Sequence, residues 1–462
     1  MAAGGHRATS RESRFILVLT AVSLTLAFLL GGGQGSAGET LLAIIGLALV
    51  VIAVVRQVTS QADADRIRWF WLLPALLIAL PVLQLLPLPA FLWTSLPGRA
   101  SLVGDLATAG VEPGLGHWTL TPLDTERVLW SALVPAGVFM AAAVLRGSER
   151  RLLVALTLGF AAVNAFLGLW QLVEGPSSPL YLYQITNRGE AVGLFANRNH
   201  LAGFLAASLP VAVGTLADRL RNHPLGVRDL YVWVLTTLII LLGVTVTATH
   251  SRAGFLMLML SVVACACIVG RLGRSGALAS SLPWLRVGAL LAGVLIVQFT
   301  LYGVLQRLDT DPLDDHRWAM NSNTFAVSAP AFGTGFGLGS FRHAYDDVGD
   351  AAADIPEYVN HAHDDYAELW LEAGLPAVLL AIAAVVAVVA QVRKYLRASN
   401  GAENGEGTHR GVKLGAAFAL LLLLLHSLVD YPLRTLAIAS YAALLAAVLL
   451  GSVRISGRKR PA

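Results

Sequence analysis

Four polar residues near the end of a long polar segment could carry out chemistry: His361, His363, Asp364 and Asp365. A neutral imidazole in a partly buried cleft is a natural general base near pH 7. A His-x-His pair without a third nearby histidine is only a weak indication of a metal site. The roles of general base and metal ligand therefore both stay open for His361 and His363 at this point. The simpler role for Asp364 or Asp365 is to cap the helix that follows.

Three arginines are candidates for binding an anionic group: Arg198, Arg252 and Arg317. A guanidinium group stays charged and holds phosphate oxygens in a bidentate fork. Each arginine alone could equally reach for the membrane surface or pair with an acidic loop residue. All three are predicted on the side of the membrane that carries the histidine pair. Their grouping there favours anion binding.

His426 and Asp430 are four residues apart, on one face of a predicted helix end. A structural hydrogen bond within the helix bundle is the simpler explanation for His426.

A glycine-rich run from Gly333 to Gly339 lies upstream of the histidines. It resembles a phosphate-binding loop only superficially, because it lacks the Lys and Ser/Thr of that motif. We expect it to form a turn that lets the backbone pack closely beneath the site.

The surroundings of these residues are strongly apolar. Hydrophobic residues make up 56% of the 462 and charged residues 13%, about half the charge of a typical soluble domain. Continuous apolar runs recur that are long enough to cross a hydrocarbon core of about 30 Å. The composition predicts an all-α polytopic membrane protein, and the continuous runs argue against the alternating strands of a β-barrel.

About twelve transmembrane helices are predicted, with one large loop between spans 9 and 10 that faces away from the cytoplasm. The predicted spans are 15–31, 40–55, 70–88, 128–145, 152–173, 200–216, 231–248, 254–270, 285–304, 369–391, 412–428 and 435–452. This divides the chain into residues 1–304 with spans 1–9, residues 305–368 as the loop that carries the site, and residues 369–462 with spans 10–12 and a cytoplasmic tail.

The distribution of Lys and Arg predicts the orientation. If both termini are cytoplasmic, only nine of the 33 basic residues lie on the opposite side, as the preference for cytoplasmic cations requires. The nine are Arg99, Arg127, Arg188, Arg198, Arg252, Arg307, Arg317, Arg342 and Arg434. The first apolar run could also be a signal peptide, but an uncleaved first span suits this orientation better.

Five short motifs occur in the order in which a known family carries them. They are Gly193-Leu194-Phe195-Ala196-Asn197-Arg198-Asn199-His200-Leu201-Ala202, Thr249-His250-Ser251-Arg252-Ala253-Gly254, Arg317-Trp318 with Gly333-Thr334-Gly335-Phe336-Gly337 and Gly339-Ser340-Phe341, His361-Ala362-His363-Asp364-Asp365-Tyr366 with Glu372-Ala373-Gly374-Leu375-Pro376, and His426-Ser427-Leu428-Val429-Asp430-Tyr431. At these motifs the chain resembles the O-antigen ligase/polymerase family of membrane glycosyltransferases. Arg198 stands where that family often has proline, and Asp364 where asparagine is usual.

The resemblance implies transfer of a glycan from an undecaprenyl-diphosphate carrier on the periplasmic face of the bacterial inner membrane. It implies that His363 is catalytic and that Arg252 and Arg317 hold the diphosphate. The other expected substrate-binding residues are Arg198, His361, Asp364, Asp365 and Asp430. Of these, Asp364, Asp365 and Asp430 are the candidates to orient His363 or the acceptor. No metal, nucleotide or other cofactor is implied. The implied partners are the lipid-linked donor, lipid A–core or a second lipid-linked glycan as acceptor, and membrane lipids; no nucleic acid is expected.

Several functions stay open at this point. A ligase is favoured because His363 lies eleven residues before Gly374, a spacing associated with ligases of the family. A polymerase or a protein oligosaccharyltransferase would differ in the acceptor. A transporter of the lipid-linked glycan would need polar residues lining a path at mid-membrane. Polar residues are sparse within the predicted spans; the examples are Asn164, Gln171 and Gln298.

Overall fold

The computed structural model describes residues 2–32, 36–59, 64–184, 186–222, 229–272, 313–346, 360–397 and 409–450. Eight helices within these ranges are long and apolar enough to cross a membrane. The prediction of an all-α polytopic membrane protein is therefore confirmed, whereas the number of spans is not settled. The predicted span 285–304 lies outside the described residues.

The first half of the bundle contains helices that match the first five predicted spans. They are α1 (Ala2–Leu30), α2 (Ser36–Thr59), α3 (Ala64–Leu85), α6 (Pro122–Val144) and α7 (Gly147–Glu174). Proline lies inside α3 at Pro74 and Pro81 and inside α6 at Pro135. Packing of α2 and α3 against α6 places these three helices side by side.

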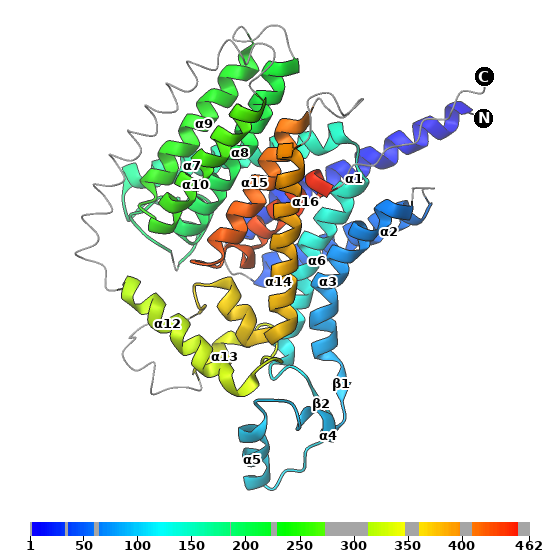
Figure 1. Ribbon diagram of the computed structural model, residues 1–462, viewed down its shortest axis with the longest axis vertical. Helices are drawn as coiled ribbons and strands as arrows, with labels where there is room; N and C mark the ends of the chain where they lie inside the picture. Colours follow the sequence, from blue (N-terminus) through cyan, green and yellow to red (C-terminus); the bar gives the residue numbers. More distant parts are fainter. Residues whose placement is uncertain are drawn as a thin grey trace.

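The second half supplies α8 (Arg198–Asn222), α9 (Leu230–Ala248), α10 (Arg252–Leu272), α14 (Asp365–Arg397), α15 (Arg410–His426) and α16 (Leu436–Leu450). Each overlaps a predicted span. In Figure 1, α8, α9 and α10 (green) lie side by side, and α14 (orange) passes beside α15, in agreement with their packing contacts.

Helix α8 lies at the centre of the bundle and packs along α15 through small residues. A Cβ atom on Gly203 would lie 2.2 Å from Nδ1 of His426, and one on Gly214 would lie 2.1 Å from the carbonyl oxygen of Gly411. Small residues allow the backbones of membrane helices to approach closely. This approach brings the start of α8, with His200, next to the end of α15, with His426.

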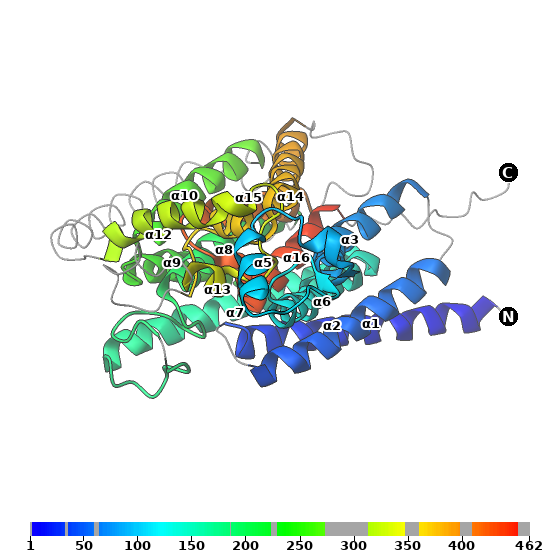
Figure 2. The ribbon, with the colours of Figure 1, turned by 90° about the horizontal axis from the view of Figure 1, so that it is seen from below.

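The connections at one end of the bundle are themselves folded. Between α3 and α6 lie β1 (Pro87–Leu88), α4 (Ala90–Trp93), α5 (Ala100–Thr108) and β2 (Gly116–His117), and the two strands pair antiparallel. The predicted large loop contains α12 (Leu313–Ser328), the 3₁₀ turn η2 (Ala329–Ala331) and α13 (Phe341–Asp346), and a second 3₁₀ turn, η4 (Pro432–Arg434), precedes α16. Figure 2, seen from this end, shows α5, α12 and α13 in front of the bundle.

These two connections are joined to each other. The N–H of Leu120 donates to the carbonyl oxygen of Phe336 at 2.8 Å, and the indole N–H of Trp118 donates to that of Thr334 at 3.1 Å. The two loops predicted to face away from the cytoplasm thus lie at the same end of the bundle.

The glycine-rich run packs against an interruption in α14. Gly374 has φ 57°, outside the helical range, and a Cβ on Gly335 would lie 2.5 Å from the backbone nitrogen of Ala373. The N–H of Gly337 donates to the carbonyl oxygen of Glu372 at 2.8 Å. The expectation that the glycines allow close backbone packing is confirmed, since no larger residue fits at Gly335.

Candidate functional site

A fully buried carboxylate lies against the second histidine of the His-x-His pair. Nδ1 of His363 is 3.4 Å from Oδ1 of Asp430, whose side chain is 0% exposed, whereas the side chain of His363 is 28% exposed. His363 also has a left-handed backbone, with φ 54°, a conformation that is strained for a residue with a side chain. The sequence-predicted base and one of its predicted orienting carboxylates are thus brought together.

Two further histidines surround the same carboxylate. Nε2 of His200 lies 3.9 Å from Oδ1 of Asp430, and Nε2 of His426 lies 3.9 Å from Oδ2. Burial raises the pKa of Asp430, but the contact with His363 and the neighbouring His200 and His426 outweigh it and hold the pKa below its usual value. Asp430 is therefore a carboxylate anion among imidazoles.

The ring of Tyr431 lies among three imidazoles. Its centroid is 4.1 Å from that of His361, 4.8 Å from that of His200 and 5.1 Å from that of His363. Tyr431 follows Asp430 directly, so one short segment supplies both the carboxylate and the packing surface for the histidines.

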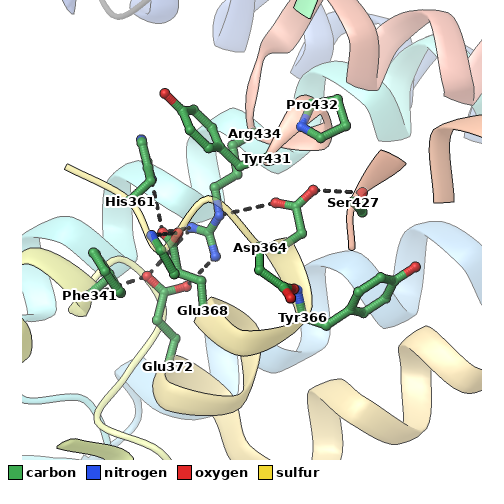
Figure 3. Close-up of polar contacts among 12 residues, drawn as sticks. Phe341, His361, Asp364, Tyr366, Glu368, Glu372, Ser427, Tyr431, Pro432 and Arg434 are labelled. Atoms are coloured by element: carbon green, nitrogen blue, oxygen red, sulfur yellow. Dashed lines mark hydrogen bonds and ion pairs between the residues drawn. The ribbon is translucent and has the colours of Figure 1, made fainter. Parts of the chain in front are cut away.

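The first turns of α14 carry three buried carboxylates around one arginine. Nε of Arg434 lies 3.4 Å from Oδ1 of Asp365, Nη1 lies 3.0 Å from Oε1 of Glu368, and Nη2 lies 2.9 Å from Oε2 of Glu372. Figure 3 shows the guanidinium group of Arg434 directed at Glu368 and Glu372. Burial lowers the pKa of Arg434, whereas the three carboxylates raise it by a larger amount. The pKa therefore lies above its usual value.

The two carboxylates that follow the histidines have different partners. Oδ1 of Asp364 accepts from the backbone N–H groups of Tyr366 at 2.9 Å and Ala367 at 3.1 Å. Asp364 thus caps α14, and burial raises its pKa. Asp365 accepts a hydrogen bond from Oγ of Ser427 at 2.7 Å and pairs with Arg434. Neither contacts His363 in the hydrogen bonds and ion pairs of the described residues.

Arg198 has an acidic partner in its own loop. Its Nη1 lies 3.0 Å from Oε1 of Glu190, and the other oxygen of Glu190 lies 2.7 Å from Nδ1 of His250. This is the pairing with a loop acid that the sequence left as the alternative to anion binding. The backbone N–H of Arg198 donates to Oδ1 of Asn187 at 3.0 Å, which fixes the start of α8.

Arg252 begins α10 directly after a turn that is tied to α8. The turn contains His250 with φ 50°, and Oγ of Ser251 donates to Oδ1 of Asn199 at 2.7 Å. Asn199 immediately precedes His200, which faces Asp430. The backbone at Arg252 is therefore joined to the histidine cluster through a short series of contacts.

Arg317 lies on α12, which packs against α14. Its side chain is outside the part of the chain whose side chains the structure describes. The helix against which α12 packs begins at Asp365, two residues after His363.

Sequence reasoning missed several residues of this site. His200 and Tyr431 belonged to the family-like motifs, and Arg434 was one of the nine outer basic residues, but none was given a role. Glu368 carried no signal beyond its position shortly after the histidine motif.

A bundle of membrane-length helices with histidines, carboxylates and arginines gathered at one end defines a polytopic membrane protein with a polar site at the bundle end. Residues 237–403 match the family model described as O-antigen ligase. The match confirms the family resemblance that the motifs predicted and supports a membrane function of the O-antigen ligase or polymerase type. The matched region contains Arg252, Arg317 and His363, whereas Arg198 and Asp430 lie outside it. No curated protein matches the chain.

Proposed function

We propose that this protein transfers a glycan from an undecaprenyl-diphosphate carrier to an acceptor hydroxyl at the periplasmic face of the bacterial inner membrane. The transfer is a single displacement that inverts the configuration at C1 of the first sugar. The acceptor oxygen forms the new bond to C1, the bond from C1 to the diphosphate breaks, and the acceptor proton goes to the enzyme.

The observation that carries this proposal is the contact between His363 and Asp430. A buried carboxylate anion facing Nδ1 favours the imidazole tautomer that has its proton on Nδ1. Nε2 is then the nitrogen that accepts the acceptor proton. The carboxylate also stabilises the imidazolium that forms, as in other carboxylate–histidine pairs.

The leaving diphosphate needs positive charge, and arginine side chains are suited to supply it. Arg252 and Arg317 are assigned to it, with Arg198 as a further contact. Arg252 is supported by its place next to the turn that is tied to the His200 segment. Arg198 would have to share its guanidinium between the diphosphate and Glu190.

A ligase acting on lipid A–core is the form of the activity that we favour. A polymerase of the same family would use the same base and the same arginines, and would differ in the acceptor hydroxyl. The proposed arrangement has both termini in the cytoplasm, residues 305–368 as the periplasmic loop that carries the site, and helical spans on both sides of it.

The test is a transfer assay with purified protein and a lipid-linked glycan. Lipid A–core, a second lipid-linked glycan and a hydroxyl-containing peptide are offered in separate reactions. Sugar on lipid A–core is the expected result, and sugar on the second lipid-linked glycan would establish the polymerase instead. Transport of the glycan across a vesicle membrane without transfer to any acceptor would contradict the proposal.

A further inference from the structure

Both oxygens of one buried carboxylate hold the His361–His363 segment. Oε1 of Glu368 lies 3.0 Å from Nδ1 of His361, and Oε2 accepts a hydrogen bond from the backbone N–H of Ala362 at 3.1 Å. The Glu368 side chain is 1% exposed. Charge-assisted hydrogen bonds of this kind are stronger than neutral ones, so Glu368 fixes the segment just before His363.

The segment needs such support because of its shape. His363 adopts the left-handed backbone conformation, which is strained for a residue other than glycine. Ala362 is fully buried and belongs to a small apolar core with Ala367 and Leu371. The turn is therefore held by packing at Ala362, by Glu368 on one side and by Asp430 on the other.

Arg434 connects this support to the segment that supplies Asp430. It lies four residues after Asp430, in the short connection between α15 and α16, and its guanidinium pairs with Glu368. The same connection is joined to α14 by the backbone N–H of Asp365, which donates to the carbonyl oxygen of Ser427 at 2.9 Å. The pair of Glu368 and Arg434 thus links the segment that supplies His363 to the segment that supplies Asp430.

We propose that Glu368 and Arg434 are positioning residues for the His363–Asp430 pair. They fix the imidazole relative to its carboxylate and take no part in bond making or breaking. The proposal rests on the proposed function of His363 as the base. Because such residues act only through His363, their loss should lower kcat and leave the KM for the lipid-linked donor unchanged.

The first test compares two matched substitutions on α14. Glu368→Gln keeps the shape of the side chain but removes the charge and one of the two acceptor oxygens. Since a displacement of about 1 Å can cost on the order of 10²-fold in rate, we expect kcat to fall by about 10–100-fold. Glu372→Gln makes the same chemical change beside the same Arg434, at a side chain without a contact to residues 361–363 among the described interactions.

Glu372→Gln should therefore keep kcat near that of the unaltered protein. Equal losses in both variants would mean that the charge of the cluster matters rather than the hold on the histidine segment, and would overturn the proposal. An unchanged kcat in folded Glu368→Gln protein would overturn it as well.

A second measurement does not depend on activity. Modification of His363 by diethylpyrocarbonate, followed by peptide mass spectrometry, reports how well the imidazole is held. We expect faster modification in Glu368→Gln and in Arg434→Lys than in Glu372→Gln or the unaltered protein. Equal modification rates in all four proteins would contradict a positioning role.

If Glu368→Gln does not fold, as judged by thermal unfolding in detergent, Glu368→Asp takes its place. The aspartate keeps the charge beside Arg434 but is one methylene too short to hold both His361 and Ala362, so kcat should again fall at unchanged KM. The proposed function is judged separately with His363→Ala. Activity in that variant rejects the base, whereas an inactive His363→Ala with a normal Glu368→Asp rejects only the positioning role.

Discussion

Nδ1 of His363 lies 3.4 Å from Oδ1 of Asp430, although the two residues are separated by the whole of α14 and α15 in the chain. One is half-buried and the other is completely enclosed. This relationship suits the general base that we propose, which is open to substrate on one side and faces an ionised carboxylate on the other.

Replacing His363 by alanine should abolish glycan transfer while the protein still folds and inserts into the membrane. Loss of a general base lowers a rate by about 10²–10⁴-fold. His343→Ala is the matched control, because His343 is 60% exposed and pairs with Asp124 rather than with Asp430. Transfer is measured with purified proteins, and a nearly normal rate in His363→Ala would exclude its role as the base.

Asp430→Asn should keep the shape of the site and lose most of the rate. The amide cannot stabilise an imidazolium or select the tautomer with its proton on Nδ1. We expect kcat to fall by about 10²–10⁴-fold, with little change in the KM of the donor. Asp105→Asn, an exposed aspartate on α5, is the control. A kcat equal to that of the unaltered protein would show that His363 works without its carboxylate.

The stability of the protein should depend on the ionisation of Asp430 in acid. Its pKa in the folded state lies below the unfolded value of 3.8, so the ionised carboxylate stabilises the fold fully above that value. This contribution is lost as the pH falls through the lower folded pKa. The difference in melting temperature between the unaltered protein and Asp430→Asn should therefore shrink below about pH 4. A difference that grows steadily as the pH falls below 3.8 would contradict this.

Arg252→Lys and Arg317→Lys should each be strongly impaired although the charge is kept. A lysine ammonium cannot replace the two parallel hydrogen bonds that a guanidinium gives to phosphate oxygens. Arg127→Lys, at an exposed arginine paired with Asp124, should transfer glycan normally. Activity of the unaltered protein should also survive excess EDTA. If chelation abolishes activity and a divalent ion restores it, the arginine-based mechanism is wrong.

The close approach of α8 and α15 should tolerate no methyl group at Gly203. Its Cβ would lie 2.2 Å from Nδ1 of His426, and overpacking of this kind costs about 1–3 kcal/mol. Gly270→Ala, in α10, meets open space and should leave stability unchanged or raised. Thermal unfolding in detergent compares the two variants, and equal melting temperatures would show that the two helices can move apart at no cost.

The helices were predictable because a membrane span depends on a run of apolar residues, which is a local property. The predicted span 128–145 corresponds to α6, and 231–248 to α9. The predicted span 369–391 covers the apolar part of α14, whose start at Asp365 agrees with the cap predicted at Asp364 or Asp365. Its first turns are polar and are buried by Arg434 rather than by lipid, so hydropathy does not reveal them.

The site was predictable where chemistry and sequence spacing coincide, as for the His361–His363 pair. The contact of His363 with Asp430 was expected only as one of three alternatives, because nothing local distinguishes Asp430 from Asp364 and Asp365. The Glu368–Arg434 pair spans 66 positions of sequence, and only the packing of α14 against the α15–α16 connection brings it together. For Arg198, pairing with an acidic loop residue was one of the predicted alternatives, but the sequence did not identify Glu190 as that residue.

Two of the sparse polar residues within the spans also have roles that sequence did not suggest. Oε1 of Gln171 accepts from the N–H groups of Val192 and Gly193, and Oδ1 of Asn164 accepts from that of Leu194. These side chains anchor the loop that leads into α8. A polar residue in an apolar helix indicates a partner, but the sequence alone does not say whether that partner is a substrate or the protein's own backbone.

The interruption of α14 at Gly374 divides this helix into two sections. Asp365, Glu368 and Glu372 all lie in the first section, and most of the apolar length lies in the second. Spans tilt when the thickness of the surrounding bilayer differs from their own hydrophobic length. We expect a helix broken at this point to take up such a tilt at Gly374, which would leave the geometry around His363 less sensitive to the lipid composition of the membrane.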